Sequence, residues 1–236
     1  MTQLHLPIPN GEAIPYTLER RARKTVGLKI NHNGLIVHAP TRLSQKELER
    51  MLLSKADWIV KKLQSQQENQ LEKFIWQDGA SLLLLGNAIE LSVRMDSVSR
   101  ALEYEPGRIS VALPTPNNQT SIARKVLQWY KKQAQTDFTR RIALLAAKLG
   151  VDTPPLFLSS ARSRWGSCNS RGEVRLNWRL LQAPPNIINY VVAHELAHLK
   201  EMNHSAKFWA TVERIYPDYK TAEKELKAWS AKLHRI

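Results

Sequence analysis

A group of histidines toward the C-terminal end of the sequence carries the clearest chemical signal. His194 and His198 are four residues apart, and Glu195 follows the first of them. On a helix, residues four apart lie on one face, so two imidazole rings can point at a single metal ion. Glu195 points about 100° away from His194, which suits it to proton transfer better than to metal binding. The pattern indicates a Zn²⁺ cofactor, with Glu195 activating a zinc-bound water.

A zinc hydrolase usually has three protein ligands and leaves the fourth position for water. His204 follows His198 by six residues, where a reversing chain can bring it under the metal. Glu201 and Glu213 are rival carboxylate ligands, and Glu213 is the more serious rival because a following helix can supply such a residue. We expect His204 to be the third ligand, with Phe208 and Trp209 forming a wall of the site.

The polar segment that precedes these histidines offers substrate-binding candidates. If the predicted strand at residues 173–178 borders the metal cleft, its edge can pair with an extended peptide. Guanidinium groups nearby could equally well bind phosphate or carboxylate, although arginines are also common on the surface of a basic protein. The candidates are Arg164, Trp165, Arg175 and Asn177.

Strand and helix signals alternate in a way that predicts an α+β fold. Strand patterns, interrupted by one helix that opens with the capping pair Ser44 and Glu47, occupy most of the first half of the chain. Amphipathic patterns dominate the second half, where helices are expected over residues 121–149, 186–202, 206–215 and 221–233. Asn203 is expected to end the second of these in the left-handed conformation. The proline-rich segment around residues 114–118 predicts a β-rich N-terminal region over residues 1–116 and a second domain over residues 117–236.

Composition limits the cellular setting. The 236 residues include 35 Lys and Arg against 21 Asp and Glu, a net charge of +14 that makes nucleic acid a possible partner. No apolar run approaches the roughly 18 residues of a membrane-spanning helix, and the first residues lack the features of a signal peptide. A single cysteine, Cys168, fits a reducing compartment. We therefore expect a cytoplasmic protein that has no membrane partner.

Several sequence blocks together resemble a known family. They read RWGSC, LNWRL, YVVAHELAHL and NHSAKFW, and they begin at Arg164, Leu176, Tyr190 and Asn203. This combination resembles the YgjP-type metallopeptidase-like family, which is related in pattern to SprT and WLM domains. The resemblance covers most of the chain and implies a minimal zincin domain after the β-rich region. It also implies His194, His198 and His204 as the zinc ligands and Glu195 as the catalytic residue.

The resemblance leaves three activities open. The favoured one is a zinc-dependent metallopeptidase that acts on peptides or proteins. Some family members carry a nucleotide pyrophosphatase assignment, so metal-dependent hydrolysis of a nucleoside triphosphate such as UTP is the first alternative. The second is a nucleic-acid-associated SprT-like protease or binding module, which the basic charge would suit.

Overall fold

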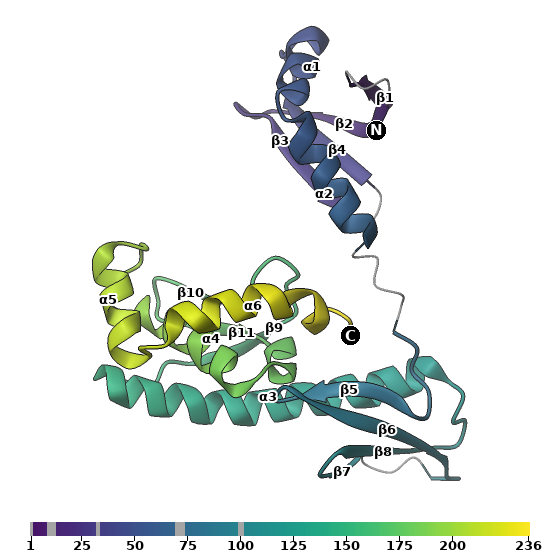
Figure 1. Ribbon diagram of the computed structural model, residues 1–236, viewed down its shortest axis with the longest axis vertical. Helices are drawn as coiled ribbons and strands as arrows, with labels where there is room; N and C mark the ends of the chain where they lie inside the picture. Colours follow the sequence, from purple (N-terminus) through teal and green to yellow (C-terminus); the bar gives the residue numbers. More distant parts are fainter. Residues whose placement is uncertain (1, 9–12, 32–33, 69–73, 99–101) are drawn as a thin grey trace. The chain divides into compact units, whose positions relative to one another are not determined.

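The computed structural model describes residues 2–8, 13–31, 34–68, 74–98 and 102–236. The chain divides into two compact units, Met1–Lys73 and Phe74–Ile236 (Figure 1). Both combine sheets with helices, and strands dominate the N-terminal part, which confirms the predicted α+β class and the β-rich N-terminal region. None of the described helices is both long and apolar enough to cross a membrane.

The first unit is a four-stranded sheet with two helices. Its strands lie in the order β1-β2-β4-β3, with β2 parallel to β4 and the other pairs antiparallel. Alternate residues of β4 are buried, so one sheet face packs against apolar side chains of both helices, including Leu48 and Ile59. Ser44 and Glu47 form the predicted capping box. The elements are β1 (Thr2–Pro7), β2 (Ala13–Arg21), β3 (Gly27–Asn31), β4 (Gly34–Pro40), α1 (Gln45–Leu53) and α2 (Ala56–Glu68).

The second unit opens with another four-stranded sheet, in the order β5-β6-β8-β7. Its buried residues, among them Leu91 and Val111, belong to the same hydrophobic core as Val126 and Tyr130 of the long helix α3. The Tyr130 hydroxyl also donates a hydrogen bond of 2.7 Å to the Leu83 carbonyl. These elements are β5 (Ala80–Leu84), β6 (Asn87–Met95), β7 (Glu103–Glu105), β8 (Arg108–Leu113) and α3 (Gln119–Leu149).

The compact units divide between Lys73 and Phe74, whereas the sequence predicted a boundary at residues 116 and 117. The reason is the shared core, because β5–β8 bury their apolar face with α3 and the 3₁₀ helix η1 (Trp178–Gln182). The β5–β6 turn also donates backbone hydrogen bonds of 2.8 and 3.0 Å to carbonyls of η1. The proline-rich segment is therefore a turn inside one unit, and Asn118 at its end caps α3.

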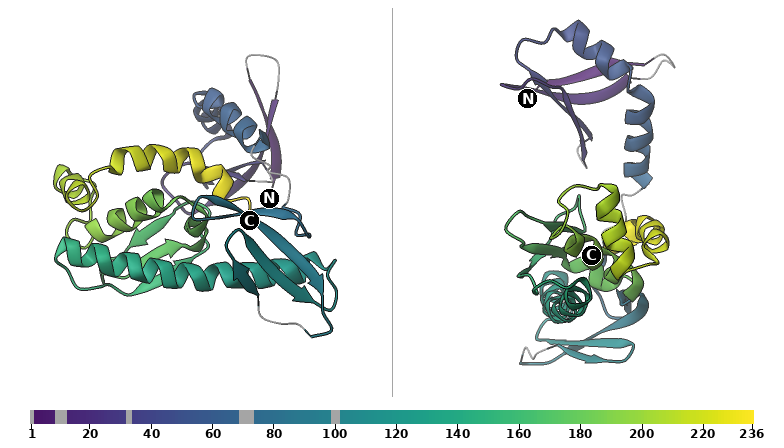
Figure 2. Two further views of the ribbon diagram at one scale, coloured as in Figure 1. Left: turned by 60° about the horizontal axis from the view of Figure 1, so that its bottom comes forward. Right: turned by 90° about the vertical axis from the view of Figure 1, so that its left-hand side faces the viewer.

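The rest of the second unit surrounds one buried helix, α4 (Pro185–Ala197). Helices α3, α5 (Ala206–Ile215) and α6 (Tyr219–Leu233) contact it, as does a three-stranded sheet in the order β10-β11-β9. Figure 2 shows α4 and this sheet enclosed between α3 and α6. The strands are β9 (Leu156–Ser159), β10 (Gly166–Cys168) and β11 (Val174–Asn177). A helix that is buried around most of its circumference must be almost entirely apolar, and α4 is, apart from a few polar positions that include His194 and Glu195.

The β5–β6 turn provides a test of the contact between this sheet and η1. Leu85 and Gly86 both have positive φ angles, 50° and 86°, as a tight two-residue hairpin requires. A Cβ on Gly86 would lie 2.9 Å from Pro184 Cγ and 3.1 Å from Pro184 Cα, whereas a Cβ on Gly107, which has the same φ, would meet nothing within 4 Å. Gly107→Ala should cost about 1–2 kcal/mol of unfolding free energy from backbone strain alone.

Gly86→Ala should cost about 1–3 kcal/mol more, because the added methyl group must also displace Pro184. Urea denaturation of both variants beside the wild type measures the difference. Equal losses in the two variants would show that the turn does not pack closely against Pro184.

Candidate metal centre

Local structure at the end of α4 differs from the sequence expectation. The helix ends at Ala197, and His198 is its C-cap, so the predicted helix to residue 202 is five residues too long. The Ala197 carbonyl accepts from both Lys200 and Glu201, which closes the chain into a tight turn. The predicted left-handed Asn203 is also wrong, because Leu85 is the single non-glycine residue with positive φ among those described. Asn203 instead accepts a hydrogen bond from the Ser205 amide with its side chain, immediately before α5.

This turn brings three imidazole rings together. One nitrogen of each of His194, His198 and His204 lies within 4.8 Å of the other two. Nε2 of His204 lies 3.1 Å from Nε2 of His194. Two nitrogens bound at zinc distances to one tetrahedral ion would lie about 3.3–3.4 Å apart, so this spacing fits a shared ion. Glu213, the rival ligand, is exposed on α5 and is not part of the group.

A backbone contact fixes which nitrogen of His198 is available. Its Nδ1 lies 3.1 Å from the Glu201 carbonyl oxygen, which can only accept. The proton is therefore on Nδ1, and Nε2 keeps its lone pair for a metal, the arrangement that metal-binding histidines usually show. Glu201 thus contributes its main-chain oxygen to the site rather than the carboxylate considered from the sequence. The Nδ1 atom of His194 is buried without a hydrogen-bond partner among the described residues.

Aromatic rings surround the histidines, as predicted for Phe208 and Trp209. The Phe208 ring centroid lies 4.9 Å from that of His194, 4.6 Å from that of His198 and 4.7 Å from that of His204. The Trp209 ring centroid lies 5.8 Å from that of His194. Burial, together with the charges of His198 and His204, lowers the pKa of His194 to about 4. A neutral imidazole at pH 7 is the form that binds a metal ion.

Glu195 is buried beside this group, with 5% of its surface exposed. Burial raises the pKa of its carboxyl to about 8, and the charge of Arg164 opposes that shift. Gly166 of β10 faces the carboxyl so closely that an added Cβ would lie 2.6 Å from Glu195 Cγ and 2.7 Å from Cδ. The glycine in the RWGSC block is the sequence signal for this contact, and sequence reasoning missed it.

The first two substrate candidates lie on the loop that leads into β10. Arg164 is exposed, and its charge acts on Glu195. Trp165 is half-buried and stacks on His234, with ring centroids 4.5 Å apart and planes at 24°. This loop therefore places one cation and one aromatic ring next to the glycine that packs on Glu195.

The other two candidates have different surroundings. Asn177 is 0% exposed, and its amide donates a 2.7 Å hydrogen bond to the Ala161 carbonyl while its oxygen caps η1. Arg175 lies on the exposed face of β11, where it stacks over Phe157 at 4.9 Å and pairs with Glu173 at 3.3 Å. Both side chains are thus occupied in interactions within their own sheet and its flanking turns.

The strand expected to offer a free edge is paired on both sides. β11 is parallel to β9 on one side and antiparallel to β10 on the other. The edge strands of this sheet are β9 and β10, and β10 also contacts α4. No described strand pairs with the outer side of β10, so this edge begins at the glycine that packs on Glu195.

Comparison with known proteins shows which family the chain matches. A family model described as YgjP-like, metallopeptidase domain, matches residues 24–229. A curated Escherichia coli K12 protein named UTP pyrophosphatase is 28% identical over 96 residues, which are 41% of this chain and 54% of that protein. The chain thus matches about half the length of this relative.

Two solved structures of metallopeptidase zymogens show a weak likeness. Abylysin of Pyrococcus abyssi is 24% identical with a TM-score of 0.37, and it is aligned over 39% of this chain and 92% of its own. Jannalysin of Methanocaldococcus jannaschii is 20% identical with a TM-score of 0.34 over the same shares. TM-scores of this size establish no shared overall fold.

The contact between Gly166 and Glu195 predicts a large effect from a single methyl group. Gly166→Ala should reduce hydrolytic turnover by about 100-fold, because the added Cβ displaces the carboxyl by an ångström or so. Gly27→Ala is the matched control, since the atoms nearest to the new methyl group there belong to the flexible guanidinium of Arg23. Turnover and bound metal are measured on both variants, and wild-type turnover in Gly166→Ala would contradict the contact.

His234, stacked on Trp165, should make the second unit less stable in mild acid. Burial lowers its pKa below the ordinary value of 6.5, and the charges of Arg179 and Arg162 lower it further. The unfolded chain then binds more protons than the folded chain as pH falls through 6.5, so unfolding free energy falls with pH in that interval.

His234→Gln should lose less stability than the wild type between about pH 7.5 and about pH 5, because it removes this proton uptake. Urea denaturation at the two pH values measures the loss. His5→Gln, which changes an exposed histidine of β1, should match the wild type. An unchanged loss in His234→Gln would show that this ring protonates freely in the folded protein.

Proposed function

We propose, from the premise that the chain belongs to the YgjP-like metallopeptidase family and is a metal-dependent hydrolase, that its metal is Zn²⁺ held by His194, His198 and His204. Imidazole nitrogens suit zinc, and the described residues add no fourth His, Cys, Asp or Glu to the group. Three protein ligands with one open position are typical of catalytic rather than structural zinc. Such an ion would polarise the bond to be broken and lower the pKa of water from about 15.7 toward 7.

Glu195 is the general base of the proposed reaction. It is the adjacent carboxyl on α4, and proton transfer to it from the attacking water, followed by donation to the leaving group, balances hydrolysis. Burial alone favours its protonated form, because a carboxylate is costly in apolar surroundings. A cation among the three imidazoles would favour the ionised form, so the same residue can hold a proton and release it during one cycle.

The position of β10 is the observation that favours a peptide as the substrate. Its edge begins at Gly166, which packs directly on Glu195. An extended peptide can add to a sheet edge through main-chain hydrogen bonds, which would hold a scissile bond beside the base without requiring a particular side chain. We therefore assign the protein as a zinc metallopeptidase acting on peptide or protein segments in an extended conformation.

A nucleoside triphosphate is the second candidate substrate. Arg164 is exposed, and its charge acts on Glu195, so a guanidinium is available to a phosphate chain near the base. The Escherichia coli relative bears the name UTP pyrophosphatase, which makes UTP the nucleotide to test. The matched region is about half of that relative. The name therefore identifies the nucleotide to test and does not establish the activity of this chain.

A substrate panel separates the two reactions. Unfolded proteins and UTP are offered to the wild type, to Glu195→Gln and to Glu213→Gln, with zinc measured in each preparation. We expect zinc-dependent peptide cleavage, a loss of about 10²–10⁴-fold in Glu195→Gln with zinc retained, and no change in Glu213→Gln. Zinc-dependent release of pyrophosphate from UTP alone would replace the peptidase with the second candidate. Hydrolysis of neither, or full activity of Glu195→Gln, would contradict the proposal.

A further inference from the structure

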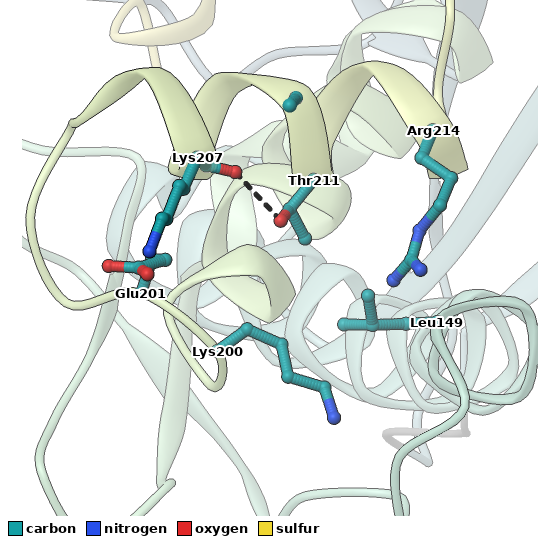
Figure 3. Close-up of a pocket in the computed structure, with 7 residues that line it drawn as sticks. Leu149, Lys200, Glu201, Lys207, Thr211 and Arg214 are labelled. Carbon is teal, nitrogen blue, oxygen red and sulfur yellow. Dashed lines mark hydrogen bonds between the residues drawn. The ribbon is translucent and has the colours of Figure 1, made fainter.

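A hollow lies beside the candidate metal centre, and none of the three histidines lines it. It has a volume of about 470 Å³ and is formed by the end of α3, the connection between α4 and α5, and one face of α5 (Figure 3). We call it the basic pocket. Its lining includes Leu149, Lys200, Glu201, Lys207, Thr211 and Arg214.

Positive charge dominates the basic pocket. Lys200, Lys207 and Arg214 are exposed, and none has an ion-pair partner in the part of the chain that the structure describes. Glu201 supplies the one carboxyl among the lining residues, so the pocket carries a net charge of about +2. In Figure 3, Arg214 and Lys200 extend toward Leu149 from two different elements. Arg214 belongs to α5 and Lys200 to the connection, so cations from two different elements line one hollow.

The walls of the basic pocket are fixed by contacts that leave these cations available. Lys148 donates a 2.6 Å hydrogen bond to the Ile215 carbonyl, which ties the end of α5 to the end of α3. Leu149 is 5% exposed and forms an apolar surface between the two helices. The Thr211 hydroxyl donates to the Lys207 carbonyl at 2.9 Å, so its proton is used within α5 and the charged donors of the pocket are the lysines and Arg214.

We propose that the basic pocket binds a phosphate group, either as free phosphate or as a small phosphate monoester. A phosphate carries a charge of about −1.5 to −2 at pH 7, which matches the net charge of the lining. Arg214 can bind two of its oxygens through a planar guanidinium, and Lys200 can add a third contact from the opposite side. Leu149 offers an apolar surface to the organic part of a monoester. This site is independent of which bond the metal centre breaks.

The position of the pocket gives the bound phosphate a structural consequence. Lys200 lies on the connection that runs from His198 to His204, whereas Arg214 lies on α5. The neighbouring Glu201 carbonyl is the one that orients His198. A phosphate bound to both cations would therefore tie this connection to α5 and restrain the segment that presents His204.

Calorimetric titration of the full chain tests the site, with inorganic phosphate and phenyl phosphate as the probes. We expect one saturable site per chain and a weakening of about tenfold or more in each of Lys200→Gln and Arg214→Gln, because each removes a charged hydrogen-bond donor. Lys131→Gln and Lys224→Gln remove the same charge from exposed positions on α3 and α6, and they should bind as the wild type does. Tighter binding of phenyl phosphate would identify an organic monoester as the ligand, and equal binding would identify free phosphate.

Titration of a metal-site variant distinguishes phosphate bound in the basic pocket from phosphate bound at the metal centre. His204→Ala removes an exposed imidazole and should leave phosphate binding within about twofold of the wild type. Absent binding, or equal affinity in the pocket variants and the wild type, would overturn the proposal. Loss of binding in His204→Ala but not in the pocket variants would also overturn it, because the phosphate would then belong to the metal centre.

Discussion

The packing of Gly166 on Glu195 is the constraint on which the candidate site depends. A carboxyl with 5% of its surface exposed must be held against an apolar core, and β10 approaches it closely enough to exclude any side chain at position 166. This contact sets the distance between the three-stranded sheet and α4. The same contact brings the edge of that sheet next to the residue proposed to move the proton. The position of a bound peptide and the position of the base are therefore both set by this contact.

The three histidines are brought together by the local structure of α4 and of the connection that follows it. Helical periodicity alone places His194 and His198 together, but His204 comes from a connection with no regular structure. That connection is shaped by its own hydrogen bonds, in particular the one from His198 to the Glu201 carbonyl. Phe208, in the first turn of α5, packs against all three rings. The proposed ligand set is therefore assembled by two helices and the turn between them.

Local signals in the sequence predicted the start of α1 and the α+β class, but not the end of α4 or the conformation of Asn203. Ser44 with Glu47 marks the start of α1 through a capping box that satisfies backbone donors. The expected α+β class and the pairing of His194 with His198 follow from the same kind of short-range periodicity. The family resemblance, carried by blocks of adjacent residues, is confirmed by a match over most of the chain.

Features that depend on distant residues could not be predicted in this way. Gly166 and Glu195 are far apart in the sequence, and no periodicity relates them. The segment at residues 114–118 has the composition of a linker, but burial of β5–β8 with α3 makes it a turn inside one unit. Asn177 is polar and lies near the site in the sequence, yet it is fully buried and bonded to the Ala161 carbonyl. Tertiary packing decides which side chains are buried and which groups they hydrogen-bond, and a single sequence does not display that packing.

Zinc titration of the wild type, His204→Ala and Glu213→Ala tests the central claim most directly, because it asks which side chains complete the metal site. Three converging imidazoles predict one zinc per chain in the wild type and in Glu213→Ala. They also predict that His204→Ala loses more than the roughly 10–100-fold in affinity that removal of an orienting partner costs. Zinc binding in His204→Ala equal to that of the wild type, or its loss in Glu213→Ala, would contradict the proposed ligand set.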